Sequence, residues 1–235
     1  TLVIIFLLYL HQKRYINSVN IWPKRKMDFF TFFFIFALNI AKGFVSGIII
    51  FLINTFRGAE DVVIPGSVQD IGTELYIILI AILIGPITEE LIFRGAGLSL
   101  FNKRDNKLEA IIFTSTIFGL MHGNYAQAIN ATISGLIYGY VAIEFGIVYS
   151  ILFHMLNNAM VYLEYFLDLD NLLTALSILV LFICYWFREE FIELIKTNLK
   201  SETEFSVKRL LSYFLYPSLT LIFLSHHSFS FYVLL

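Results

Sequence analysis

Long uninterrupted apolar runs are the feature that most limits what this chain can fold into. Residues 28–56 and 74–101 are mostly apolar over more than the roughly 20 residues that a helix needs to cross a ~30 Å hydrocarbon core. Charged residues make up only 14% of the chain, against about 25% in a typical soluble domain. The sequence therefore predicts an all-α, polytopic membrane helix bundle of about eight helices.

The expected helices follow from the apolar runs between charged loops. They span residues 2–10, 28–56, 74–101, 110–122, 127–143, 146–166, 172–187 and 210–224. The chain opens on Thr1 and not on Met, so we expect the first run to be the end of a longer span. We interpret residues 1–235 as a single membrane-embedded domain, since no soluble domain or internal repeat stands out.

The distribution of basic residues supports this count. Lysines and arginines gather in the loops at 11–26 and 103–107 and in the segment 188–209, whereas the intervening loops carry mostly Asp and Glu. Positive charge collects in cytoplasmic loops, and these loops fall on one side if every span alternates in direction. The net charge of −2 gives no basic field, which argues against a nucleic-acid partner.

Two adjacent carboxylates and an arginine lie inside the third expected span. Glu90 and Arg94 are four residues apart, so they share a helix face and are expected to form a structural ion pair. Glu89 points about 100° away and has no cation on its own helix. A buried charge in a membrane is costly and usually marks function, so we expect Glu89 to be a general base.

Two histidines on later helices fall at a comparable depth. Counted from the cytoplasmic loops at ~1.5 Å per residue, Glu89, His122 and His154 stand roughly 21, 22 and 15 Å above that side. Asn158 shares a face with His154 at a spacing of four. We therefore expect a catalytic cavity among the central helices, within a core over residues 74–166.

This set of side chains admits two hydrolytic mechanisms. In one, Glu89, His122 and His154 hold a zinc ion that activates water. In the other, Glu89 and His122 activate water without a metal, while His154 and Asn158 donate hydrogen bonds to the oxyanion. The His-Glu-x-x-His spacing of soluble zinc peptidases is missing, and an amide is a poor zinc ligand. We favour the mechanism without a cofactor.

The series Glu89-Glu90-x-x-x-Arg94, Phe118-x-x-x-His122 and His154-x-x-x-Asn158 resembles the signature of the CAAX protease and bacteriocin-processing (CPBP, or Abi) intramembrane endopeptidases. The resemblance covers roughly residues 74–166. It implies a helical membrane core, with the first glutamate and first histidine as water activators and the last pair at the oxyanion. Phe118 is a supporting motif residue. The implied substrate is a membrane-associated protein or peptide, prenylated in the CAAX-processing members of the family.

Other functions remain open from sequence alone. A non-enzymatic scaffold or immunity protein of the same fold would bind its partner through its helices. A transporter would use Glu89 and the histidines as a proton relay, although no inverted repeat supports it. The composition is rich in Ile, Phe and Lys, which is compatible with an AT-rich bacterial genome. We therefore expect a multi-pass protein of a bacterial cell membrane, surrounded by lipid.

Overall fold

A computed structural model describes residues 25–57, 75–98, 106–199 and 204–214. Within these ranges every regular element is a helix and no strand occurs, which confirms the predicted all-α bundle. The expected first span and the residues after 214 lie outside the described residues. The observed helices are α2 (Phe29–Arg57), α4 (Leu75–Leu79), α5 (Gly85–Glu90), α7 (Lys107–Leu120), α8 (Tyr125–Glu144), α9 (Ile147–Leu167), α10 (Asp170–Trp186), α11 (Arg188–Asn198) and α12 (Val207–Phe214).

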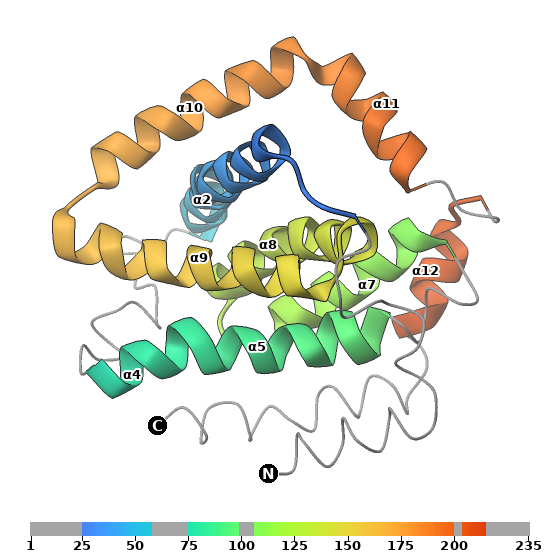
Figure 1. The fold of residues 1–235 in the computed structure, drawn as a ribbon, viewed down its shortest axis with the longest axis horizontal. Coiled ribbons are helices and arrows are strands. Elements are labelled where there is room, and N and C mark those ends of the chain that lie inside the picture. Colours follow the sequence, from blue (N-terminus) through green and yellow to red (C-terminus); the bar gives the residue numbers. More distant parts are fainter. Residues whose placement is uncertain (1–24, 58–74, 99–105, 200–203, 215–235) are drawn as a thin grey trace.

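The helices pack in layers around α8 and α9 (Figure 1). In that view α8 and α9 lie between α5 on one side and α2 with α10 on the other, and α7 packs along α8. Among the described residues, two stretches are long and apolar enough to cross a membrane: α2, and the continuous helix Leu75–Gly97 that contains α4 and α5. A third candidate combines α10 with α11, which meet at 78°.

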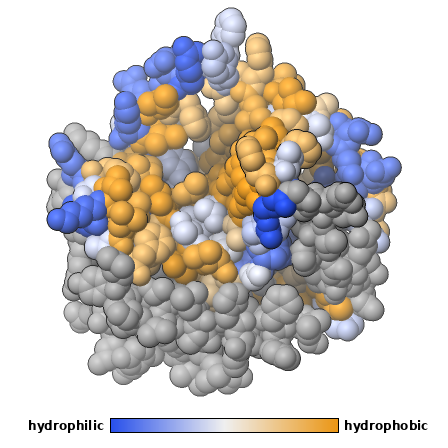
Figure 2. Space-filling model, turned by 180° about the vertical axis from the view of Figure 1, so that it is seen from behind, coloured by the Kyte–Doolittle hydropathy of each residue, from blue (hydrophilic) through white to orange (hydrophobic). Residues whose placement is uncertain are grey.

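Large apolar side chains on the outer surface fit a lipid environment. Figure 2 shows them over much of the face opposite to the view in Figure 1, with hydrophilic residues in smaller groups. Phe30 is 82% exposed and Phe56 89% exposed, at opposite ends of α2. Exposed side chains of this size would be unfavourable in water, so this face indicates contact with acyl chains.

Most helix ends differ from the sequence prediction by a few residues, for identifiable reasons. α7 begins at Lys107 rather than residue 110, because the side chain of Asn106 caps it by accepting from Leu108 N. α2 begins after Asp28, whose carboxylate accepts from Thr31 N and Thr31 Oγ1. These hydrogen bonds from Thr31 hold the pKa of the Asp28 carboxyl below its ordinary value.

The segment predicted over residues 188–209 contains α11, while α12 begins near its end and continues to Phe214, inside the span expected over residues 210–224. α11 carries its first part, and α12 docks on α7 through a buried carboxylate. Glu109 accepts from Arg209 Nε at 2.6 Å and from Arg209 Nη2 at 2.7 Å, and it also accepts from Ser206 N. Such bidentate pairs combine charge with fixed geometry, so they set where α12 lies on the bundle.

Glycine allows α7 and α8 to approach closely. A Cβ added at Gly119 would lie 2.0 Å from Thr132 Oγ1 and 2.4 Å from the carbonyl oxygen of Ala128. At Gly135 it would lie 2.8 Å from Ser115 Cβ. Small residues at such crossings are the usual means of tight packing between membrane helices. The crossing also fixes α7 where it carries Phe118 and leads into His122.

We predict that Gly119→Ala lowers the thermal stability of the protein in detergent by an amount equivalent to about 1–3 kcal/mol, because backbone must move to admit the methyl group. Gly47→Ala in α2 is the control, since a Cβ there meets nothing within 4 Å. Both variants can be followed by fluorescence-detected thermal unfolding. Equal midpoints for the two variants would contradict the close-approach explanation.

Candidate functional site

The helix that carries the two glutamates contains two wider, π-helical turns. They are η2 (Ile80–Ile84) and η3 (Leu91–Gly97), and they flank α5 on either side. In η2, Gly85 N bonds to Ile80 O, five residues back. Pro86 follows and has no N–H to donate. The carbonyl of Ala81 therefore lacks both the donor of an α-helix, Gly85 N, and the donor of a π-turn, which would be the N–H of residue 86.

Asn158 on α9 supplies the missing donor. Its Nδ2 donates to Ala81 O at 2.9 Å, and its Oδ1 accepts from Asn157 Nδ2 at 3.1 Å. A buried carbonyl without a partner costs free energy, so this bond stabilises the turn that precedes the glutamates. Asn158 thus couples α9 to the helix of Glu89, a structural task that the sequence analysis did not assign to it.

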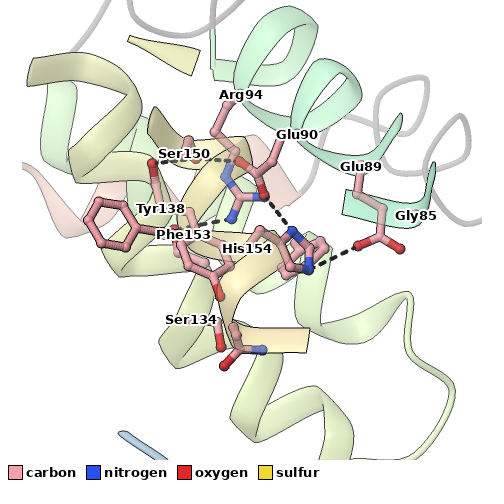
Figure 3. A network of polar contacts seen from close by, with 12 residues as sticks. Gly85, Glu89, Glu90, Arg94, Ser134, Tyr138, Ser150, Phe153 and His154 are labelled. Atoms are coloured by element: carbon pink, nitrogen blue, oxygen red, sulfur yellow. Dashed lines mark hydrogen bonds and ion pairs between the residues drawn. The ribbon is translucent and has the colours of Figure 1, made fainter. Parts of the chain in front are cut away.

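Glu90 is the centre of a fully buried polar network (Figure 3). Neither Glu90 nor Arg94 exposes any side-chain surface, and Arg94 Nη1 donates to Glu90 Oε1 at 2.9 Å. Ser150 Oγ donates to Glu90 Oε2 at 2.5 Å, and His154 Nδ1 lies 3.0 Å from Glu90 Oε1. One carboxylate therefore accepts from three side chains on two helices.

Arg94 extends the network to α8. Its Nη2 donates to Gly135 O at 3.2 Å, and its guanidinium lies 4.6 Å from the ring centroid of Phe118. This guanidinium contacts a carboxylate, a carbonyl and an aromatic face. Arg94 therefore joins α7 and α8 to the helix of the glutamates.

The hydrogen bond to Glu90 orients the ring of His154. A carboxylate paired with Arg94 can only accept, so Nδ1 of His154 carries the hydrogen. The other ring nitrogen, Nε2, lies 3.7 Å from Glu89 Oε2. Figure 3 shows Glu89 approaching the ring from the side opposite to Glu90. The Glu89 side chain is 31% exposed, whereas the Glu90 side chain is fully buried. Of the two carboxylates, Glu89 is therefore the accessible one.

Aromatic rings fix the plane of His154. Tyr138 stacks on it at a centroid distance of 4.9 Å and an angle of 25°, and Phe118 meets it edge-on at 5.8 Å. Phe118 also contacts His122, at 4.9 Å. The two histidines therefore lie against one phenylalanine, whose position follows from the packing of α7.

His122 lies just beyond the end of α7, in the turn before α8. Its Nδ1 donates to the carbonyl of Phe118 at 2.9 Å. A carbonyl oxygen can only accept, so this bond assigns a hydrogen to Nδ1, and in the neutral ring Nε2 is then the acceptor. An unprotonated Nε2 is what a general base requires.

The structure brings the predicted site residues together unequally. Glu89, Glu90 and His154 are in direct polar contact, and Asn158 lies one turn further along α9. Within the described ranges no hydrogen bond or ion pair joins His122 to Glu89 or His154. In the same ranges no three His, Cys, Asp or Glu side chains are grouped as metal ligands, so Glu89, His122 and His154 do not form a ready zinc site in this arrangement.

Two supporting residues were missed by the sequence analysis. Ser150 lies four residues before His154 and shares its face, a signal that helical spacing carried. Tyr138 is fully buried and lies on a different helix from its partner ring. Nothing in the spacing of the sequence connects Tyr138 to His154, because the contact depends on how α8 and α9 cross.

Comparison with known families agrees with this geometry. Residues 71–160 match the family described as type II CAAX prenyl endopeptidase Rce1-like. The matched segment contains every motif residue named above, and it confirms the resemblance to the CPBP endopeptidases over these residues. No curated protein and no solved structure matches the chain. The segment that carries the site is thus similar to a family of prenyl endopeptidases.

We predict that Glu90→Gln destabilises the protein by about 3 kcal/mol or more, because Arg94 would remain charged in a dry environment. Glu89→Gln, at the neighbouring position, is the matched control and should change stability little. Thermal unfolding in detergent measures both. Replacing the pair together, as Glu90→Leu with Arg94→Met, should be less harmful than Glu90→Gln alone. Equal losses at Glu89 and Glu90 would contradict the assignment.

We predict that Asn158→Leu loosens the helix around Pro86, because Ala81 O loses its donor. Hydrogen exchange of peptides covering residues 80–88 should become faster. Asn157→Leu is the control, since Asn157 bonds to Asn158 and not to that helix, and it should have the smaller effect. Unchanged exchange in Asn158→Leu would show that the bond does not stabilise the turn.

Proposed function

We propose that this protein is an intramembrane endopeptidase that hydrolyses a peptide bond of a membrane-associated protein or peptide. The observation that carries the proposal is the pair of Glu89 Oε2 and His154 Nε2, 3.7 Å apart inside a helix bundle. A partly exposed carboxylate beside a histidine can accept a proton from water. The match to a prenyl endopeptidase family supports the same chemistry.

In the proposed reaction Glu89 and His122 activate water. Glu89 accepts a proton from the water as its oxygen attacks the scissile carbonyl carbon, and His122 Nε2 orients that water. The carbonyl oxygen becomes an oxyanion. The proton then passes to the leaving nitrogen as the C–N bond breaks, so the carboxylate is regenerated.

His154 and Asn158 are proposed to stabilise the oxyanion, with one condition that the structure adds. Nδ1 of His154 is committed to Glu90, so only Nε2 is left to donate, and this requires the imidazolium form. Two carboxylates, Glu90 at Nδ1 and Glu89 near Nε2, lie beside the ring, and together they balance the charges of Arg94 and the imidazolium. Asn158 uses one Nδ2 hydrogen on Ala81 and keeps a second one for the substrate.

The proposal assigns no cofactor. For a zinc ion to bind, His122 would have to move next to Glu89 and His154. The bound zinc would then act as a Lewis acid in the same reaction.

We further propose that the protein is a multi-pass protein of a bacterial cell membrane. Its substrates include peptides anchored there, with or without a prenyl group.

The test is cleavage by the purified protein in detergent micelles, using a prenylated peptide, its non-prenylated form and a hydrophobic transmembrane peptide. We expect Glu89→Gln and His122→Ala each to lower the cleavage rate by about 10²–10⁴-fold. Glu190→Gln, an exposed change on α11, should leave the rate unchanged. The three peptides together identify the substrate class.

Two outcomes would contradict parts of the proposal. Full cleavage by Glu89→Gln would remove Glu89 from the mechanism. Loss of cleavage on prolonged chelation, with recovery on adding zinc, would favour the metal-dependent alternative. If the wild-type protein cleaves no peptide while Glu89→Gln and His122→Ala retain biological function, the protein is a non-enzymatic scaffold or immunity protein and not a protease.

A further inference from the structure

A cavity with mixed polar and apolar walls lies between α2, α8, α9 and α10, and the hydrolytic site does not use it. Its volume is about 690 Å³. α9 lines it with Asn157, Met160, Val161 and Glu164, whereas Glu89, His122, His154 and Asn158 are not among its lining residues. Figure 1 shows α2 and α10 on the side of α9 that is turned away from α5. The cavity is therefore separate from the carboxylate–histidine pair.

A lysine is buried in the wall of this cavity. Lys42 lies midway along the 29-residue helix α2 and is only 5% exposed. Its Nζ donates to Asn130 Oδ1 at 3.0 Å. An ammonium has three hydrogens to donate, and this bond uses one of them. A cation at such a position is costly in a membrane and usually has a functional partner.

Two carboxylates line the same cavity nearer its exposed end. Glu164 is half-buried and Asp170 is exposed. Lys42 and Glu164 line the same cavity. Among the described residues, however, no carboxylate lies within 4 Å of Lys42 Nζ. The cavity therefore holds opposite charges that are not joined, with the cation deep and the anions toward the opening.

The remaining walls are mixed in a way that suits an organic ligand. The amide of Asn130 contacts the lysine, and Ser46 Oγ lies 3.3 Å from the same Asn130 Oδ1. Apolar side chains complete the lining: Phe36, Ile40, Phe44, Ile50, Met160 and Val161. A few placed polar groups within apolar walls are typical of small-molecule sites.

We propose that this cavity binds a zwitterion that carries an anionic group, an ammonium group and an apolar part. Lys42 and Asn130 hold the anionic group, and Glu164 with Asp170 hold the ammonium. Two sources share this chemistry: a free amino acid or short peptide, and the headgroup of an ethanolamine phospholipid. The proposal is independent of the hydrolytic function, because none of these residues belongs to that site.

Matched probes test the proposal on the purified protein in maltoside micelles. L-leucine carries both charges, N-acetyl-L-leucine only the anion and L-leucinamide only the cation. Dihexanoyl phosphatidylethanolamine and dihexanoyl phosphatidylglycerol form the corresponding lipid pair. Titration calorimetry should show one of the two zwitterions binding at least about tenfold more tightly than its singly charged analogues, since each charged contact contributes. Which zwitterion binds identifies the source.

Variants assign each charge. Lys42→Met should abolish the preference for the bound zwitterion over L-leucinamide. Glu164→Gln should abolish the preference for the bound zwitterion over the analogue that carries only the anion. Lys196→Met, an exposed change on α11, should leave binding unchanged. If Lys42→Met does not fold, Glu164→Gln carries the same test. The proposal is overturned if neither zwitterion binds more tightly than its analogues, or if Glu164→Gln leaves the preference intact. Failure here leaves the peptide-cleavage assay unaffected.

Discussion

One buried carboxylate organises the centre of this protein. Glu90 exposes no surface, yet it accepts hydrogen bonds from Arg94, Ser150 and His154. Its charge is compensated on one side by a guanidinium that also reaches Gly135 O. Removing one member of such a buried network leaves its partners without hydrogen bonds, which is costly. The orientation of His154, and through it the environment of Glu89, depends on this one anion.

The same geometry divides the adjacent glutamates by their surroundings. Glu90 is buried among donors, whereas Glu89 keeps 31% of its side chain exposed and lies 3.7 Å from His154 Nε2. Two residues of one type can perform different tasks when their environments differ in this way. Glu90 holds the helices together, and Glu89 remains partly accessible. Helix α9 contributes to both sites, because its His154 contacts the two glutamates and its Glu164 lines the cavity of Lys42.

Helical periodicity was enough to predict the bundle, the helix carrying Glu89, Glu90 and Arg94, and the face shared by His154 and Asn158. It could not predict Tyr138 stacking on His154, since that contact depends on a helix crossing. It also could not show that Glu90 holds Nδ1 of His154, or that Asn158 serves Ala81 O. Lys42 was visible as a lone charge midway along an apolar span, and the sequence analysis passed over it.

The π-helical turns have a consequence for length changes in this helix. Each wide turn accommodates one more residue than a regular turn would hold. Deleting a single residue within Ile80–Ile84 would narrow the wide turn to a regular α-helical one and leave the residues beyond it in register. A deletion in the regular turn of Gly85–Thr88 would instead rotate Glu89 and Glu90 by about 100°, away from His154. The site should therefore survive the loss of one residue from Ile80–Ile84 but not the loss of one from Gly85–Thr88.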